Sequence, residues 1–287
     1  MGKTVGEALR EAAERLTAAE VPDARLDGEY LLAEALHTNR LSLLVNKQRT
    51  LTDAEQTAFD ALIARREKRE PLQYILGEQS FMGFLFQTDP RALIPRNDTE
   101  ALCEEALRRI RPGDSVLDLC TGTGALAIAI KKLCPAASVT ATDVSADALS
   151  LAMENARALH ADVGFLQGDL FEPVRGQRFH VIVSNPPYVP ETLRGRLQAE
   201  VEKEPALALF GGTDGLDFYR RIAQEAPEHL HPQGRLILEI GDGQGDAVSF
   251  LLADALENIH ILNDLSGLPR VVSAVKKEGS RRVGSAV

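Results

Sequence analysis

The chain has 287 residues, of which 44% are apolar and 26% charged, the balance of a globular protein with room for one main domain and a small second one. Its formal net charge of −10 argues against a large nucleic-acid footprint, because such a footprint needs a basic face. No segment approaches the roughly 20 consecutive apolar residues that a membrane-spanning helix needs.

Three cysteines at irregular positions, Cys103, Cys120 and Cys134, are too few for a disulfide framework or a zinc site. No other pattern of metal ligands is present, so no bound metal is expected. The first residues run directly into an amphipathic helix with acidic side chains, so no signal peptide is expected. These features together predict a protein of the reducing cytoplasm.

Residues 1–71 are predicted to form a small helical bundle, because apolar residues recur at helical spacing. A second helix is expected over residues 23–37, with Leu26, Tyr30 and Ala33 along one face. The bundle carries no catalytic constellation, which favours a role in packing or in binding a partner. Two capping-box patterns mark helix starts, Thr4 with Glu7 and Thr52 with Glu55.

One dense basic cluster lies at residues 65–69. The favoured interpretation is the solvated face and C-terminal end of a helix, where cations complement the helix dipole. A contact with RNA or with an acidic partner is the alternative. Pro71 is expected to end the bundle, and the glycine and phenylalanine residues within 72–90 predict a short β-hairpin that links two domains.

Residues 91–277 alternate between strand and helix, the pattern of an α/β sheet. The last two segments, 257–263 and 270–275, are expected to pair as a hairpin, and residues 278–287 to form a loose tail. Helices are expected at 125–133, 146–160 and 217–229, and the earlier strands at 115–120, 138–143, 162–167, 179–185 and 234–241.

A glycine-containing turn follows the first of these strands and runs directly into a helix. At the carboxyl edge of an α/β sheet, such a turn lets backbone approach a ligand closely and directs helix N–H groups at it. Taken alone this signal is weak, because a purely structural tight turn has the same residues. The candidate ligand-binding residues in the turn are Cys120, Thr121, Gly122, Thr123 and Gly124.

Acidic residues follow the next two strands. Asp143 ends the second strand, about twenty residues after the turn, where its carboxylate can accept bonds from ribose hydroxyls. Asp169 and Leu170 follow the third, where an acid and an apolar side chain can hold an adenine edge and face. Each acid alone fits a helix cap or turn equally well. Their occurrence at successive strand ends predicts a ligand that contains a nucleoside.

The GxGxxG pattern of dinucleotide sites is absent from the turn. The turn instead resembles the glycine loop of class I methyltransferases, in which Cys120 replaces a common first glycine. That resemblance implies S-adenosylmethionine as cofactor and S-adenosylhomocysteine as product. It also implies a Rossmann-like, mostly parallel seven-stranded sheet with a terminal antiparallel hairpin, here preceded by the helical bundle.

The fourth strand ends in the run Asn185, Pro186, Pro187 and Tyr188. A rigid strand exit is the structural alternative, since proline restricts itself and its predecessor. The chemistry favours a substrate site, because the Asn185 side-chain oxygen and the Pro186 carbonyl can each accept one hydrogen of a planar NH2 group. Tyr188 can stack on that group. Such positioning activates an amide or aryl amine as a methyl acceptor, and glutamine, adenine and guanine all remain possible.

Several segments resemble the release-factor glutamine methyltransferase family, whose members methylate the glutamine of the Gly-Gly-Gln motif in peptide chain release factors. The resemblance covers almost the whole chain, although the helical region matches in type more than in residues. It lies in residues 71–86, 93–100, 116–128, 184–190, 204–216, 238–241 and 264–272.

Carried over by position, the resemblance implies that the helical region docks the release factor and that no nucleic acid has to bind. In the segment 93–100, a buried structural salt bridge accounts for Arg96 and Glu100 as well as any other role does, and neither is assigned to catalysis. The implied cofactor contacts fall on Cys120 to Gly124, Asp143, Leu170 and Asn185, and the substrate contacts on Asn185 to Tyr188.

Three alternatives stay open. A related glutamine methyltransferase acts on a ribosomal protein, and the residues at 93–100 and 264–272 favour the release-factor branch over it. An amino methyltransferase of nucleic acid needs a positive channel that the acidic composition does not indicate. A catalytically silent cofactor-binding regulator is disfavoured by the intact motif at 185–188.

Overall fold

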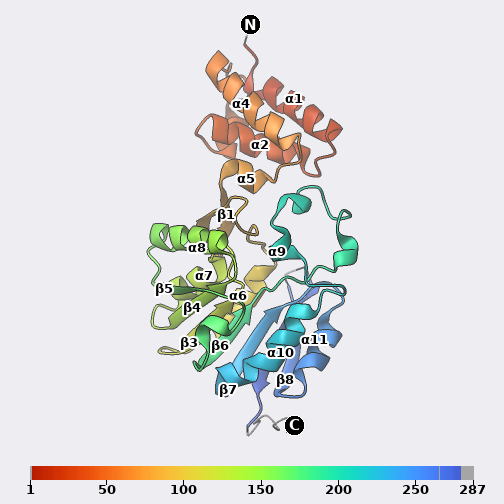
Figure 1. The fold of residues 1–287 in the computed structure, drawn as a ribbon. Helices are drawn as coiled ribbons and strands as arrows, with labels where there is room; N and C mark the ends of the chain where they lie inside the picture. The colour runs from red at the N-terminus through yellow and green to blue at the C-terminus, as the bar shows by residue number, and fades with distance from the viewer. Residues whose placement is uncertain (1, 265, 279–287) are drawn as a thin grey trace. The chain divides into compact units, whose positions relative to one another are not determined.

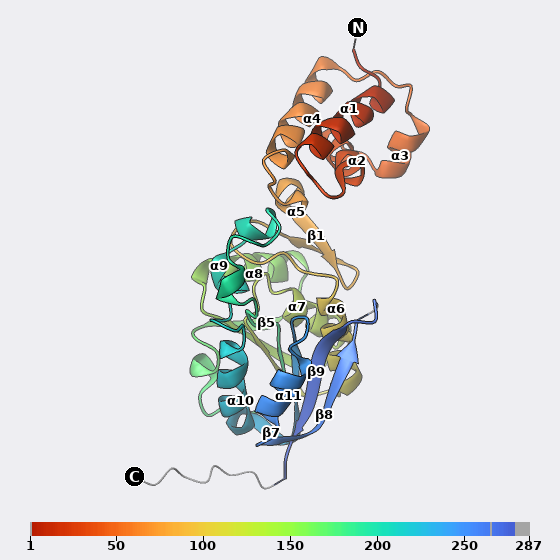
Figure 2. The same cartoon turned by 90° about the vertical axis from the view of Figure 1, so that its right-hand side faces the viewer.

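The computed structural model describes residues 2–264 and 266–278, and the chain divides into two compact units (Figures 1 and 2). We call Met1–Glu78 with Leu197–Lys203 the helical unit, and Gln79–Arg196 with Glu204–Val287 the sheet unit. The break after Glu78 falls inside the predicted linker 72–90. The return of residues 197–203 to the helical unit was not predicted.

The helical unit contains an additional short helix, α3, between the predicted ones. Both predicted capping boxes are confirmed, with the Thr4 and Thr52 hydroxyls accepting from the backbone N–H groups of Glu7 and Glu55. The predicted face of the second helix is only partly buried, because Ala33 is buried while Leu26 is 38% exposed, and the core contains Leu31. The helices are α1 (Val5–Ala18), α2 (Ala24–Ala35), α3 (Arg40–Val45), α4 (Asp53–Arg66) and α5 (Leu72–Leu76).

Pro71 begins a helix rather than ending the bundle. It is the N-cap of α5, where its fixed φ of −52° suits a helix start and its missing N–H costs nothing. The helix ends at Gly77, whose φ of 78° forms a left-handed C-cap. The predicted hairpin follows immediately, as β1 (Glu78–Phe81) and β2 (Phe84–Gln87).

The basic cluster at 65–69 lies at the C-terminal end of a helix, as predicted, with Arg65 and Arg66 in the last turn of α4, but it is not a solvated face throughout. Arg66 is only 4% exposed and donates from Nε to Asp27 Oδ2 at 2.7 Å. The Arg66 and Arg69 guanidinium groups both pair with Glu200 at 2.7 Å, and Arg65 pairs with Glu70. The three arginines are therefore neutralised by acids of their own unit, and the contact with RNA loses its basis.

The sheet unit contains a seven-stranded sheet in the order β5-β4-β3-β6-β7-β9-β8, antiparallel only at β9. This order confirms the predicted fold, including the terminal hairpin. The strands are β3 (Ser115–Leu119), β4 (Ser138–Asp143), β5 (Val163–Gln167), β6 (Phe179–Ser184), β7 (Leu230–Glu239), β8 (Leu256–Asn263) and β9 (Pro269–Lys276).

Helices cover both faces of this sheet (Figure 2). Successive residues of a strand point to opposite faces, so Val116 packs with α6 and α7 while Leu117 packs with α10 and α11. Helix α6 had not been predicted. The helices are α6 (Thr99–Arg109), α7 (Ala125–Leu133), α8 (Ala146–Ala158), α9 (Ala206–Leu209), α10 (Asp217–His229) and α11 (Gly245–Leu252), with short 3-10 turns at Glu172–Val174, Glu191–Leu193 and Val201–Lys203.

None of the helices in the described residues is both long and apolar enough to cross a membrane. The predicted loose tail, 278–287, lies outside the described residues except for Glu278. The order in which strands are added to the sheet reverses beside β3, because the chain proceeds from β3 to β4 and β5 on one side and then resumes with β6 on the other. Ligands of open α/β sheets bind at this reversal, beyond the carboxyl ends of the strands.

Candidate active site

The predicted glycine turn joins β3 to α7 at the reversal point. Gly122 has a φ of 56°, and no atom lies within 4 Å of the position its Cβ would take, so the turn leaves open space beside it. Cys120 has a φ of 60°, in the left-handed region where a residue with a Cβ is strained. A glycine would take this conformation without strain. A cysteine at position 120 is therefore expected to lower the stability of the folded state by about 1–2 kcal/mol.

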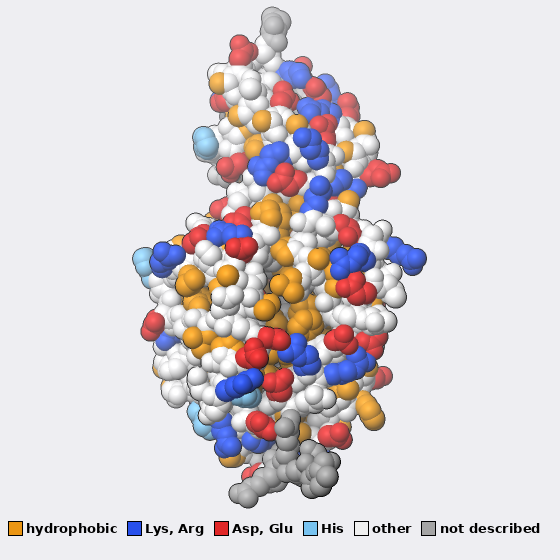
Figure 3. Space-filling view, viewed as in Figure 1, with side chains coloured by type: hydrophobic (Ala, Val, Ile, Leu, Met, Phe, Trp, Pro, Cys, Tyr) orange, Lys and Arg blue, Asp and Glu red, His pale blue; other side chains and the backbone are white. Residues whose placement is uncertain are grey.

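Two adjoining cavities open at this turn. Counting space that is open to solvent, the larger has an empty volume of about 700 Å³ and the smaller about 450 Å³. Both are lined by Leu93, Cys120, Gly122 and Asn185. On the sheet unit in Figure 3, hydrophobic side chains gather near α9, whose Leu207 lines the larger cavity and is 56% exposed.

The predicted acids lie at the larger cavity. Asp143 accepts from the N–H groups of Gly122 and Ser145, each at 2.9 Å, so the turn and the start of α8 hold both its oxygens. Burial raises the pKa of Asp143 above its ordinary value. Asp169 accepts from Arg221 at 2.6 Å, and the buried Leu170 follows it with a φ of 46°. Asp143, Asp169 and Leu170 all line the cavity.

The predicted substrate motif lies beside the turn, because β6 is the parallel neighbour of β3 and Leu119 pairs with Ser184. The Ser184 hydroxyl donates to the Leu119 carbonyl at 2.8 Å and ties the two strand ends together. Asn185 then lines both cavities, and Pro187 lines the larger one.

Pro186 and Tyr188 are not among the residues that line the two cavities. Tyr188 is half-buried, and its hydroxyl donates to Glu239 Oε1 at 3.3 Å. Gly215 approaches the same segment closely, since a Cβ there would lie 2.2 Å from the Tyr188 carbonyl oxygen. The residues 211–216 noted in the sequence therefore serve as a support packed against the Asn-Pro-Pro-Tyr segment.

Asp118 is a residue of the site that the sequence reasoning missed. It lines the smaller cavity, is 1% exposed, and accepts from the Thr121 hydroxyl at 2.6 Å. Burial raises its pKa to about 7, against the opposing hydrogen bonds of Thr121 and the Ala127 N–H. Its position one residue before the end of a buried strand was the available signal.

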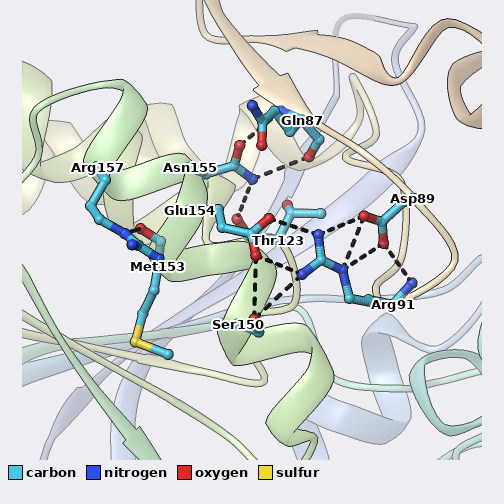
Figure 4. Close-up of polar contacts among 9 residues, drawn as sticks. All are labelled: Gln87, Asp89, Arg91, Thr123, Ser150, Met153, Glu154, Asn155 and Arg157. Atoms are coloured by element: carbon cyan, nitrogen blue, oxygen red, sulfur yellow. Dashed lines mark hydrogen bonds and ion pairs between the residues drawn. The ribbon is translucent and has the colours of Figure 1, made fainter.

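Arg91 is a second missed residue, and Figure 4 shows how it is held. Its guanidinium pairs with Asp89 and with Glu154 of α8, both at 2.7 Å, and these bonds raise its pKa. Nearby, Asn155 donates to the carbonyls of Gln87 and Thr123, at 3.1 and 3.0 Å (Figure 4). These bonds fasten residues 87–91 to α8 and so build one wall of the larger cavity, which Arg91 lines.

The residues retained in segment 93–100 separate into different contacts. Arg96 pairs with Glu204, which is buried, while the Glu100 carboxylate accepts from the Met82 N–H at 2.7 Å. Both residues therefore make structural contacts. They do not form a salt bridge with each other. Thr99 accepts a hydrogen bond from Asn185 Nδ2 at 3.2 Å.

The glycine turn and acid-lined cavities at the reversal point of this sheet define a methyltransferase fold. Residues 7–77 match the PrmC N-terminal domain family and residues 98–200 the methyltransferase small domain family. A solved methyltransferase from Pyrococcus furiosus superposes with a TM-score of 0.53 at 20% identity, covering 67% of this chain and 88% of that one.

Curated relatives give the particular family. The release factor glutamine methyltransferase of Geobacter sulfurreducens is 47% identical over 88% of this chain and 89% of its own length. The one from Moorella thermoacetica is 43% identical over 96% of this chain and 99% of its own length. The chain belongs to the release factor glutamine methyltransferase family.

Proposed function

We propose that this protein transfers a methyl group from S-adenosylmethionine to the side-chain amide nitrogen of the Gly-Gly-Gln glutamine in peptide chain release factors. The observation that carries the proposal is the position of Asn185, whose amide lines both cavities where β3 and β6 end side by side. We place this activity in the cytoplasm, where release factors act.

The residues at the cavities fit the cofactor by chemistry. Asp143 keeps free lone pairs that can accept from ribose hydroxyls, while Asp169 and Leu170 offer an acid and an apolar face for adenine. The turn at 120–124 leaves room for the methionine part, and the Asp118 carboxylate at the smaller cavity attracts its ammonium group. Bound there, the cofactor supplies a methyl group on a positively charged sulfur, which departs as the neutral thioether of S-adenosylhomocysteine.

The Asn-Pro-Pro-Tyr segment prepares the acceptor nitrogen. A glutamine NH2 is a poor nucleophile because its lone pair is delocalised into the amide. The Asn185 Oδ1 and Pro186 carbonyl oxygens each accept one of its hydrogens, which fixes the nitrogen and raises its electron density. We expect the Tyr188 ring to stack on the planar amide of the bound acceptor, although Tyr188 does not line the cavities of the structure. Alignment of this kind can supply up to about 7–11 kcal/mol of the barrier.

The helical unit docks the release factor in this proposal. Helix α3 supports it, because Leu41 and Val45 are 70% and 76% exposed and lie four residues apart on one helix, where their side chains are neighbours that a partner could cover. Deleting residues 1–70 would also remove the arginine partners of Glu200, so point variants test docking more cleanly. Leu41→Glu with Val45→Glu is expected to raise KM for release factor about tenfold and leave kcat unchanged. An unchanged KM would contradict the docking role.

Incubation with methyl-labelled S-adenosylmethionine tests the activity. Purified release factor, the same factor with its Gly-Gly-Gln glutamine changed to alanine, ribosomal proteins, DNA and RNA serve as acceptors. Label is expected in the unchanged release factor only. Label in ribosomal protein or nucleic acid would overturn the substrate assignment in favour of one of the alternatives.

A further inference from the structure

The Asn-Pro-Pro-Tyr segment, Asn185–Tyr188, has to be held in place by groups outside itself. Its two prolines have no N–H, so neither can donate a backbone hydrogen bond. The start of the segment is fixed by the sheet, because Ser184 pairs with both neighbouring strands, β3 and β7. The far end leaves the sheet, so the position of the segment also depends on what holds Tyr188.

Gln244, the N-cap residue of α11, holds the backbone of Tyr188. Its Nε2 donates to the Tyr188 carbonyl oxygen at 3.0 Å and to the Gly215 carbonyl oxygen at 3.4 Å. Its Oε1 accepts from the Gly241 N–H at 2.9 Å. A flipped amide would turn its oxygen toward two carbonyl oxygens and its NH2 toward an N–H, so these contacts allow one orientation only.

Glycines bring the surrounding backbone close to the same segment. A Cβ at Gly211 would lie 2.4 Å from the Pro187 carbonyl oxygen and 3.0 Å from the Tyr188 Cα. A Cβ at Gly241 would lie 2.8 Å from Gln244 Oε1 and 3.0 Å from the Tyr188 ring. The two loops that carry these glycines therefore enclose the end of the segment, and Gln244 lies between them and bonds to both.

We propose that Gln244 is a positioning residue for methyl transfer. By holding the Tyr188 carbonyl it fixes the Asn-Pro-Pro-Tyr segment beside the cavities, where Asn185 and Pro187 form part of the walls. The proposal rests on the proposed function, because it is the acceptor amide that requires this segment to keep one shape.

The physical reason lies in the few torsions that the segment has. Its peptide bonds are planar, and each proline ring holds φ near about −65°. With Ser184 bound in the sheet and Tyr188 bound by Gln244, little freedom is left for the residues between them. Loss of the bond at Tyr188 frees one end, so the ψ angles of the segment can vary and Asn185 no longer keeps a fixed position.

Two substitutions in the full chain separate the hydrogen bonds of Gln244 from its bulk. Gln244→Met keeps the length of the side chain and loses its hydrogen bonds. Gln244→Glu keeps the shape and an acceptor for the Gly241 N–H, but an ionised carboxylate cannot donate to the Tyr188 carbonyl. A protonated carboxyl can donate to it again. Asp242→Asn is the matched control, because Asp242 lies in the same turn and is exposed.

The expected result is a loss of turnover that protonation reverses in one variant. With saturating cofactor and release factor, Gln244→Met is expected to lose about 100-fold in kcat, the scale of a misplaced reacting group. Gln244→Glu should lose as much at high pH, and its kcat relative to that of the unmodified protein should rise as pH falls. Asp242→Asn should keep its kcat. Affinity for S-adenosylhomocysteine, measured by calorimetry, and the midpoint of thermal unfolding should change little in all three.

Gln244→Met also controls for another group that titrates near the segment. Glu239 accepts from the Tyr188 hydroxyl, and burial raises the pKa of Glu239 to about 7. Because Gln244→Met retains Glu239, a recovery at low pH in Gln244→Glu alone belongs to the introduced carboxyl.

A second readout needs no substrate, so it separates this proposal from the choice of substrate. The Val189 N–H follows Tyr188 directly and donates to the Leu209 carbonyl at 2.8 Å. Its hydrogen exchange, measured by NMR and compared with the unmodified protein at the same pH, should be faster in Gln244→Met and unchanged in Asp242→Asn.

Three results would overturn the proposal: an unreduced kcat in Gln244→Met, a relative kcat of Gln244→Glu that does not vary with pH, or a loss of cofactor affinity as large as the loss of kcat. If Gln244→Met does not fold, the pH series of Gln244→Glu decides alone. Absence of release-factor methylation by the unmodified protein would refute the proposed function instead, and the exchange of Val189 would still show whether Gln244 holds the segment.

Discussion

Glu200 of the helical unit and two buried carboxylates of the sheet unit, Asp118 and Glu239, have pKa values shifted in opposite directions. In the helical unit, Arg66 pairs with Asp27 and Glu200, and the bonds from Arg69 and Arg66 overcome the effect of burial and lower the pKa of Glu200 to about 2. In the sheet unit, burial raises the pKa of both Asp118 and Glu239 to about 7.

These carboxylates differ in whether an arginine or lysine is paired with them. Among the described residues, no arginine or lysine forms an ion pair with Asp118, Asp143 or Glu239. A carboxylate without a cation costs stability, so its retention beside a cavity points to a ligand or a substrate. We infer that the ion pairs of Arg66 stabilise the helical unit and that the unpaired Asp118 and Asp143, which line the cavities, serve binding or chemistry in the sheet unit, where buried pairs such as Arg96 with Glu204 occur as well.

Asn185→Ala should have the largest effect. It removes an acceptor for the substrate amide, and loss of one positioned polar group typically costs about 100- to 1,000-fold in kcat. Cofactor affinity should fall far less, and the midpoint of thermal unfolding should hardly change. Single-turnover kinetics and calorimetry measure the two effects. Turnover within a few-fold of the unmodified protein would contradict the role of Asn185.

Arg66→Met tests the buried ion pairs of the helical unit. It leaves Asp27 and Glu200 buried without this cation, which is expected to cost about 3–5 kcal/mol of unfolding free energy. Arg65→Met is the matched control, because its pair with Glu70 is 43% and 30% exposed and should be worth less than about 1 kcal/mol. Denaturant unfolding measures both. Equal losses in the two variants would remove the distinction between buried and exposed pairs.

Glu239→Gln should change stability in a pH-dependent way. The folded pKa of about 7 exceeds the ordinary 4.5, so the unmodified protein loses stability as pH rises between these values. The glutamine variant does not titrate at this position and lacks this loss. Its unfolding free energy relative to that of the unmodified protein should therefore increase by up to about 3 kcal/mol from pH 4 to pH 8.

Glu200→Gln is the control, because the pH dependence of its effect on stability has the opposite sign. The folded pKa of Glu200 is lowered to about 2, so its contribution is present above pH 4.5 and is lost as pH falls toward 2. The deficit of this variant should therefore shrink on acidification. Melting curves across pH compare the two, and a gain for Glu239→Gln that does not vary with pH would contradict the unpaired state of Glu239.

Cys120→Gly should have the smallest effect. Glycine relieves the strain of the left-handed conformation but adds about 0.5–1 kcal/mol of unfolded-state entropy, so the net gain should be below about 1 kcal/mol. Cys120→Ala keeps the strain and should give no gain. Equal stability of the two variants in denaturant unfolding would show that the φ of 60° carries no cost.

Much of the fold could be predicted because its signals are local. The strand at 138–143 was predicted with its observed ends, Ser138 and Asp143. The two capping boxes need only four residues each. The cavity-lining positions of Cys120, Asp143 and Asn185 followed from their places at the carboxyl ends of parallel strands.

The contacts that could not be predicted join residues far apart in the sequence. Arg69 and Glu200 are separated by 131 residues, and Thr99 and Asn185 by 86. Nothing local in the sequence distinguishes a basic residue that meets a distant acid from one that meets solvent, so the helix end at 65–69 was predicted but the burial of Arg66 was not. The separate roles of Thr99, Arg96 and Glu100 were hidden for the same reason.

Location of the transferred methyl group tests the central claim most directly. After reaction with S-adenosylmethionine, the release factor is digested and its fragments are sequenced by tandem mass spectrometry. The account predicts a single added methyl group on the side-chain amide of the Gly-Gly-Gln glutamine, absent when Asn185→Ala replaces the unmodified protein. A methyl group on any other residue, or equal methylation by Asn185→Ala, would contradict the account.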